Sequence, residues 1–302
     1  MTTIEPTRIG GSIFRWGERT FVMGIVNVTP DSFSGDGLLE RSDPSRAGST
    51  AAVVIERAVE EATRMVAEGA DILDIGGEST RPGHETVGDA EEAERVVPVV
   101  AAIHRSLPDT PISVDTTKPS VARAALDAGA VLLNDVWGVG SDEGMTRLAA
   151  ERGVPIVLMH NRAHAEYRDL IGEVVADLRA AVDRAVAFGL PAGSIIVDPG
   201  FGFGKTAAQN VELLADLDRL VELGRPILLG TSRKSTLGKV LGLPADERLE
   251  ATLATTALAV RSGVDIVRVH DVRANLRAAR MADAVIRGWD RDPAAASAGM
   301  NR

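Results

Sequence analysis

The sequence predicts an α/β fold in which eight parallel strands and their helices close into a (β/α)8 barrel, the TIM-barrel architecture. Eight short runs rich in β-branched residues alternate with longer stretches whose apolar residues recur every three or four positions. The short runs are almost continuously apolar, which is typical of parallel strands covered on both faces. The units follow one another without a linker, and this favours a closed barrel over an open sheet.

The expected strands span residues 21–26, 70–76, 111–115, 130–135, 154–160, 194–198, 226–232 and 265–270. The clearest helical patterns between them cover residues 51–69, 118–129 and 210–224. Several helical stretches end in a glycine just before the next strand, as a helix C-cap should: Gly69, Gly129, Gly153, Gly189, Gly224 and Gly263. The alternative, a doubly wound sheet, is disfavoured because no strand is followed by the dinucleotide fingerprint GxGxxG.

Three further segments complete the expected organisation. Residues 12–22 predict a short N-terminal β-hairpin that turns at Trp16-Gly17-Glu18. Residues 38–50, rich in Ser, Gly and charge, predict a mobile loop between the first strand and its helix. We expect residues 1–290 to form a single barrel domain, followed by a flexible C-terminal tail over residues 291–302.

Composition excludes several classes of function. The chain has 302 residues, of which 45% are hydrophobic, so it can build a sizeable core. A net charge of -10 and only 3% aromatic residues argue against nucleic acid as a partner. The absence of cysteine excludes disulfides, zinc-thiolate sites and a cysteine nucleophile. The N-terminus does not read as a secretory signal and no stretch approaches the ~20 apolar residues of a membrane span, so we expect a cytoplasmic protein with no membrane partner.

Hydrogen-bond acceptors follow three strands of the expected barrel. In such a barrel the chemistry lies at the carboxyl ends of the strands. The third, fourth and sixth strands end in Asp115, Asn134 and Asp198. This set suits a neutral ligand rich in N–H donors, such as a planar heterocycle with a cyclic amide and an exocyclic amine. Taken singly, each residue could also be a helix cap or a turn residue.

Donors follow the last two strands in an otherwise acidic protein. Lys234, Arg268 and His270 predict an anion site for phosphate or diphosphate, although Arg268 and His270 could instead form a structural ion pair with Asp271 or another acidic neighbour. Ser235, where the next helix begins, could hold a second anion such as a carboxylate. The loop PGFGFGKT at 199–206 is not a nucleotide loop, because it lacks the first glycine of GxxxxGK[ST].

These motifs resemble the dihydropteroate synthase family, the folate-pathway transferases, over nearly the whole chain. The matching segments are MGIVNVTPDSFS (23–34), GADILDIGGESTRPG (69–83), ISVDTTKPSVARAALDAGA (112–130), LLNDVWG (132–138), LMH (158–160), IIVDPGFGFGKT (195–206), LLGTSRKS (228–235) and VRVHDV (267–272). The resemblance implies a homodimeric barrel that condenses 6-hydroxymethyl-7,8-dihydropterin diphosphate with p-aminobenzoate, giving 7,8-dihydropteroate and diphosphate. It also suggests an SN1-like displacement and a binding site for sulfonamides.

The resemblance assigns roles by motif, with Asp115, Lys234, Arg268 and His270 as the catalytic set. The pterin would be bound by Asp115, Asn134, Asp198 and Lys234. Arg268 and His270 would anchor the diphosphate, and Asn27 would be a ligand of the Mg²⁺ cofactor that accompanies it. The expected p-aminobenzoate environment comprises Thr80, Arg81, Pro82, Phe203 and Ser235.

The chain departs from the family pattern after SRKS, where Thr236 stands in place of the usual Phe and bears on the shape of the p-aminobenzoate pocket and on sulfonamide sensitivity. The first loop reads SFSGDG where SFSDGG is usual. Two other functions fit part of the pattern: a pterin-dependent methyltransferase and a non-catalytic pterin-binding paralogue. Neither needs the cluster of Lys234, Arg268 and His270, which this chain retains.

Overall fold

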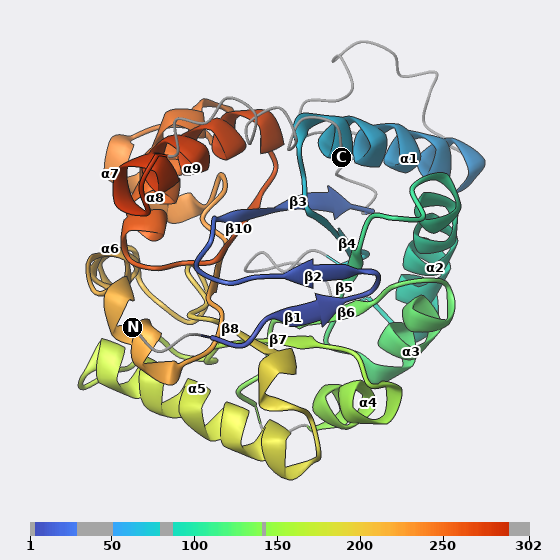
Figure 1. Cartoon of the computed structure of the whole chain (residues 1–302), viewed down its shortest axis with the longest axis horizontal. Helices are drawn as coiled ribbons and strands as arrows, with labels where there is room; N and C mark the ends of the chain where they lie inside the picture. The colour runs from blue at the N-terminus through green and yellow to red at the C-terminus, as the bar shows by residue number, and fades with distance from the viewer. Residues whose placement is uncertain (1–3, 29–50, 79–86, 141–142, 290–302) are drawn as a thin grey trace.

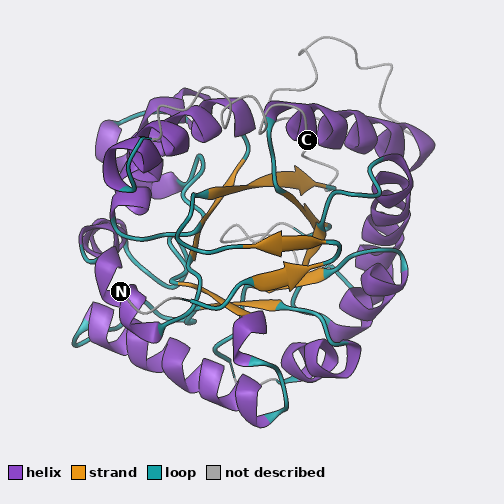
Figure 2. Cartoon of the chain, in the orientation of Figure 1, coloured by secondary structure: helices purple, strands orange, loops and turns teal. Residues whose placement is uncertain are grey.

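The computed structural model is a ring of parallel strands enclosed by helices, as predicted (Figures 1 and 2). It describes residues 4–28, 51–78, 87–140 and 143–289. The strands of the main sheet lie in the order β8-β7-β6-β5-β4-β3-β10-β9, and a parallel bridge between Val197 and Ile227 joins its two ends. The sequence-predicted α/β barrel is therefore confirmed. Among the described residues, no helix is long and apolar enough to cross a membrane.

The barrel strands are β3 (Phe21–Asn27), β4 (Ile72–Gly76), β5 (Ile112–Asp115), β6 (Leu132–Asp135), β7 (Ile156–Met159), β8 (Ile195–Asp198), β9 (Leu228–Leu229) and β10 (Ile266–Val269). The α-helices are α1 (Ala51–Glu68), α2 (Asp89–Ser106), α3 (Pro119–Asp127), α4 (Gly144–Arg152), α5 (Leu170–Ala187), α6 (Ala207–Ala215), α7 (Ser235–Leu241), α8 (Leu249–Arg261) and α9 (Val272–Ile286). Short 3-10 helices are η2 (Ala192–Ser194), η3 (Leu217–Leu223) and η4 (Ala245–Glu247).

Helix ends agree with the glycine pattern, and one helix differs from its prediction. All six glycines predicted to end helices have positive φ angles, and Gly153 and Gly224 are left-handed caps. The helix expected over 210–224 is wrong as a single element: α6 ends at Ala215 and η3 follows. The loop expected at 38–50 and the tail at 291–302 lie outside the described residues.

The core has two parts because neighbouring side chains of a strand point to opposite faces. The outer part fills the space between the strands and the helices, and Leu73 and Ile75 of β4 contribute to it. The inner part fills the barrel with one apolar side chain from most strands: Met23, Ile72, Leu132, Val157, Ile196, Leu228 and Ile266. Both faces of the sheet are therefore buried, which explains the continuous apolar runs.

An N-terminal hairpin lies across one opening of the barrel (Figure 1). Its strands are β1 (Thr7–Ile9) and β2 (Ser12–Phe14), paired antiparallel around Gly10 and Gly11. The hairpin itself is confirmed, but it lies earlier in the chain and the predicted return strand is wrong. The chain does turn at Trp16-Gly17-Glu18, but β2 before this turn pairs with β1, and β3 after it pairs with β10 and β4. Phe21 instead begins β3 of the barrel. Phe14 and Trp16 stack on each other and contact Phe21, closing the inner core at this end.

Candidate active site

A polar layer lies directly above the inner apolar layer, toward the carboxyl ends of the strands. Alternate residues of a strand point into the barrel, so the residue two positions after an inward apolar side chain also points inward. On several strands this second residue is polar. The pairs are Ile72 and Asp74, Leu132 and Asn134, Ile196 and Asp198, and Ile266 and Arg268. The alternation of the strands therefore brings Asn134, Asp198 and Arg268 to one end of the barrel, as the sequence predicts.

Arg268, on the last barrel strand, forms hydrogen bonds with carboxylates from β4 and β5. Its Nε donates to Oδ2 of Asp74 at 2.6 Å, and its Nη2 donates to Oδ2 of Asp115 at 2.7 Å. Asn134 donates from Nδ2 to the same Oδ2 of Asp74 at 3.0 Å. Asp74 and Arg268 thus connect Asn134 and Asp115 of the predicted pterin set to the predicted diphosphate set. Arg268 also forms the ion pair with an acidic neighbour that the sequence leaves open, with Asp74 and Asp115 as its partners.

Asp74 is the functional residue that the sequence reasoning missed. It lies in the middle of β4, is fully buried and contacts both Arg268 and Asn134. The position of strand ends does not predict Asp74, because it lies inside β4 and not at its carboxyl end. The signal was present, since a carboxylate within the apolar run ILDIG is costly to bury unless it is paired.

The two carboxylates beside Arg268 keep unsatisfied acceptors. Oδ1 of Asp74 and Oδ1 of Asp115 are buried and have no hydrogen-bond partner among the described residues. Burial raises the pKa of Asp115 to about 7, Arg268 opposes the rise, and Asp74 adds to it. Such buried acceptors are costly in the absence of a donor, so this part of the barrel suits a ligand that supplies N–H groups.

Lys234 and Asp198 face each other from neighbouring parts of the barrel. Burial lowers the pKa of Lys234 to about 8, and the nearby Asp198 opposes the fall. Burial likewise raises the pKa of Asp198, against Lys234 and a 2.7 Å hydrogen bond from the Gly200 amide. The Lys234 ammonium donates to the carbonyl of Phe201 and lies 4.3 Å from the centre of the Phe203 ring. Lys234 therefore connects the predicted pterin residues to Phe203.

His270 and Ser235 occupy the rim near β9 and β10. Nδ1 of His270 lies 2.9 Å from the hydroxyl of Ser232, and His270 stands two residues after Arg268 in the sequence. Asp271 forms an ion pair with Arg233, at 2.7 Å. Ser235 begins α7 and is exposed, while the next residue, Thr236, is buried.

The remaining predicted residues fall into two groups. Asn27 is half-buried at the end of β3, in register with Gly76 of β4, and so lies at the same end of the barrel. Among the described residues there is no cluster of three acidic or histidine side chains that would hold a metal by itself. The predicted p-aminobenzoate residues Thr80, Arg81 and Pro82 lie outside the residues that the structure describes.

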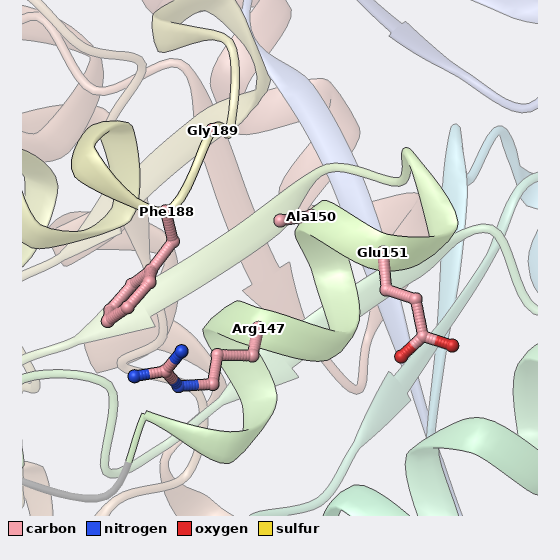
Figure 3. Close-up of a pocket in the computed structure, with 5 residues that line it drawn as sticks. All are labelled: Arg147, Ala150, Glu151, Phe188 and Gly189. Atoms are coloured by element: carbon pink, nitrogen blue, oxygen red, sulfur yellow. The ribbon is translucent and has the colours of Figure 1, made fainter.

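Two surface hollows lie away from this layer. One, of about 360 Å³, lies between α4 and the end of α5, where the guanidinium of Arg147 stacks over the Phe188 ring at 4.0 Å (Figure 3). The other, of about 510 Å³, is lined by Glu166, Tyr167, Arg168 and Glu173 at the start of α5. Neither contains a predicted site residue, so the site is the polar layer at the strand ends.

This polar layer belongs to a known class of barrel. The family model described as "Pterin binding enzyme" matches residues 23–270. That range takes in the barrel strands apart from the first two residues of β3, together with all the described site residues. The fold and the site therefore define a pterin-binding enzyme of the (β/α)8 class.

Relatives of known activity narrow the class. A dihydropteroate synthase of Clostridium beijerinckii is 47% identical over 281 residues, 93% of this chain and 99% of the relative. A structure of the Xanthomonas albilineans dihydropteroate synthase with 4-aminobenzoic acid is 41% identical, with a TM-score of 0.83 over 93% of this chain and 97% of that one. Another, in complex with 7,8-dihydropteroate, is 40% identical with a TM-score of 0.80 over 93% and 98% of the two chains. The chain belongs to the dihydropteroate synthase family, as its motifs predict, and is an alkyl-transferring enzyme.

Proposed function

We propose that the chain condenses 6-hydroxymethyl-7,8-dihydropterin diphosphate with p-aminobenzoate, giving 7,8-dihydropteroate and diphosphate, by an SN1-like displacement. The observation that carries this assignment is the buried network of Asp74, Asp115, Asn134 and Arg268, which combines unsatisfied acceptors with a cation. Membership of the synthase family supports the reaction. The related structures bound to 4-aminobenzoic acid and to 7,8-dihydropteroate support the two halves of the product.

The acceptor side of the network would bind the pterin. A pterin presents ring N–H groups and an exocyclic amine, and Asp115, Asn134 and Asp198 offer oxygen acceptors at the ends of three barrel strands. The unsatisfied Oδ1 of Asp115 would accept one of these donors and lose its burial penalty. Lys234 would add a donor from the opposite side. Binding would therefore orient the electron-rich ring that stabilises the cationic methylene in the displacement.

The donor side would take the diphosphate leaving group. As the C–O bond breaks, negative charge grows on the diphosphate, and Arg268 and His270 would meet it from β10 and its carboxyl end. The amide oxygen of Asn27 suits Mg²⁺, which prefers oxygen ligands and is commonly held by few protein groups together with substrate phosphates. When bound there, the ion would supply further positive charge to the leaving group.

The p-aminobenzoate would lie beside Phe203 and Ser235, with Thr80, Arg81 and Pro82 completing its environment. The Phe203 ring lies against the Lys234 ammonium, next to the pterin residues, and Ser235 is exposed on the same rim. An aromatic amine is neutral near pH 7, so the attack needs no strong general base. Thr236 is buried, so its effect on this pocket and on sulfonamides would act through the packing of α7.

We also propose a homodimer. Helices α7, α8 and α9 lie at one side of the barrel (Figure 1). They carry exposed apolar side chains: Val240 and Leu241 of α7, Leu258 of α8, and Met281, Val285 and Ile286 of α9. Helices α8 and α9 pack against each other, and a second copy of the chain would cover the apolar side chains that these helices and α7 leave exposed. The cytoplasmic location expected from the sequence stays a prediction.

The test is diphosphate release from the dihydropterin diphosphate, with and without p-aminobenzoate and Mg²⁺. We expect release to require both additions and to be inhibited by a sulfonamide. Pterin binding without release would contradict the proposal and favour the methyltransferase or the non-catalytic alternative. The same assay on Asp198→Ala should show no turnover, and full activity in that variant would contradict the pterin assignment.

A further inference from the structure

Lys205 lies inside the loop that joins β8 to α6 and closes that loop on itself. Its ammonium is within 3.1 Å of three acceptors: the carbonyls of Gly200 and Phe203, and Nδ1 of His160. An ammonium has three N–H groups, so its hydrogen-bonding capacity is filled. Two of these bonds hold the backbone on either side of the loop, and the third ties the loop to the end of β7.

The partner of this lysine is fixed in turn. His160 is fully buried, and its Nε2 lies 3.2 Å from Oδ2 of Asp177 on α5. Burial lowers the pKa of His160 to about 4, and Lys205 adds to the fall. The imidazole is therefore neutral near pH 7, with its proton on Nε2 and its Nδ1 accepting from Lys205. Arg162 donates to the same oxygen of Asp177 at 2.7 Å, which holds the carboxylate in place.

The loop is also packed too tightly against the β7 end to shift without cost. Gly200 has a φ of 68°, and a Cβ at that position would lie 1.8 Å from the carbonyl oxygen of His160. On its other side, the loop is contacted by Lys234, which donates to the Phe201 carbonyl and lies against the Phe203 ring. Two lysines thus hold the backbone of the loop that carries Phe203. Lys234 contacts it from the side of the proposed pterin site, and Lys205 contacts it from the side of β7.

We propose that Lys205 is a positioning residue for the aromatic amine substrate, acting through the carbonyls of Gly200 and Phe203 to orient the Phe203 ring. This inference rests on the proposed placement of p-aminobenzoate beside Phe203. Lys205 does not donate to the pterin network, since the three hydrogen bonds of its ammonium go to the loop and to His160. Its removal is therefore expected to weaken p-aminobenzoate binding more than pterin binding.

The charge of Lys205 makes this positioning dependent on pH. Burial lowers the pKa of Lys205 to about 7, Asp198 and Asp177 oppose the fall, and Lys234 and Arg162 add to it. Below that pH the ammonium donates to all three acceptors. Above it the neutral amine has two N–H groups, so one acceptor loses its donor. The KM for p-aminobenzoate should therefore rise as the pH increases through about 7.

The test compares Lys205→Met with Lys239→Met, which removes an exposed lysine of α7. For Lys205→Met we expect about a tenfold rise in the KM for p-aminobenzoate, and a KM for the pterin diphosphate within about twofold of wild type. Asp115 and Lys234 also titrate near neutral pH, so the informative quantity is the difference between wild type and variant. The KM for p-aminobenzoate should rise less above pH 7 in Lys205→Met than in wild type, because the variant lacks the titrating amine. Lys239→Met should show the same pH dependence as wild type.

Two further measurements separate the possible failures. Phe203→Ala should raise the KM for p-aminobenzoate; if it has no effect, the placement of the substrate is wrong. If Phe203→Ala raises this KM and Lys205→Met does not, the role of Lys205 is wrong. Nitrogen NMR of the wild-type imidazoles, which needs no variant to fold, should find His160 neutral with its proton on Nε2. The opposite tautomer would overturn the inference.

Discussion

Arg268 and Asp74 form a 2.6 Å hydrogen-bonded ion pair, although 194 residues separate them in the sequence. The register of β10 with β3, and of β3 with β4, brings these strands together. Because the same oxygen of Asp74 also accepts from Asn134, one buried carboxylate fixes a residue of the proposed diphosphate site and a residue of the proposed pterin site. The geometry of the two half-sites is therefore set jointly.

Asp74→Asn should impair both half-sites at once. The amide keeps the size of the carboxylate but removes its charge, so the ion pair with Arg268 is lost and the acceptor that Arg268 shares with Asn134 is weakened. We expect kcat/KM to fall at least a hundredfold and the free energy of unfolding to fall by about 2 kcal/mol or more. Steady-state kinetics and urea denaturation measure the two effects.

The matched control is Asp71→Asn, three residues earlier in the chain and just before β4. Asp71 pairs with the half-exposed Arg19, 2.6 Å away, and accepts a hydrogen bond from the Val22 amide that an asparagine oxygen can keep. Its substitution should therefore cost about 1 kcal/mol or less without a change in kcat. Wild-type kinetics in Asp74→Asn would show that the carboxylate does not organise the site.

Asp115 should make the protein less stable as the pH rises. Its pKa is raised by burial to about 7 in the folded protein, whereas an unperturbed Asp has a pKa of 3.8. Between these values the folded state holds a proton that the unfolded chain has released. The associated stability is therefore fully present at low pH and is lost as the pH increases through about 7. Urea denaturation of the ligand-free protein across this range should give a flatter pH dependence for Asp115→Asn than for wild type. Parallel curves for the two proteins would disprove the shift.

Gly200→Ala should disturb the loop between β8 and α6. The φ of 68° strains any L-residue, and the added Cβ would lie 1.8 Å from the His160 carbonyl oxygen. Gly153→Ala is the matched control, because Gly153 has a φ of 64° and an added Cβ there would meet no described atom within 4 Å. We expect about 1 kcal/mol of destabilisation for Gly153→Ala and clearly more for Gly200→Ala. Equal melting temperatures would mean that the loop moves freely away from β7.

Val285→Glu should convert a homodimer into monomers. Val285 is 72% exposed on α9, one helical turn from Met281, which is 66% exposed. A carboxylate in the centre of an apolar interface would have to be buried without a partner, which is costly. Sedimentation velocity should find a wild-type dimer and a variant monomer. A wild-type monomer at micromolar concentration would contradict the proposed interface.

The strands and helix ends are predictable because local signals agree with the fold. Apolar β-branched runs and terminal glycines coincide with the observed strands and caps. The hairpin is predicted in the wrong place because Thr20-Phe21-Val22 is extended in either arrangement, and only the pairing of Phe21 with Ile266 shows that it belongs to the barrel. The split after α6 has no clear signal, since the apolar spacing of 210–224 suits one long helix.

The site residues at strand ends are predictable, but their connections are not. Position along a strand identifies Asp115, Asn134 and Asp198, because barrel topology places strand ends together. Which cation pairs with which carboxylate depends on strand register and side-chain reach, so the sequence assigns Arg268 to an anion site without its two carboxylate partners. Predicting Asp74 as a site residue requires knowing which positions of β4 point into the barrel and which point outward.

The aromatic side chains of the hairpin separate the end of the barrel that contributes to stability from the end that carries the proposed site. Phe14, Trp16 and Phe21 pack over the inner apolar layer, with the polar layer at the other end of the strands. Substitutions around the hairpin can therefore raise or lower thermal tolerance while turnover stays constant. Substitutions at the opposite rim should in turn leave this closure intact, and a more stable hairpin would let the chain tolerate rim changes that otherwise prevent folding.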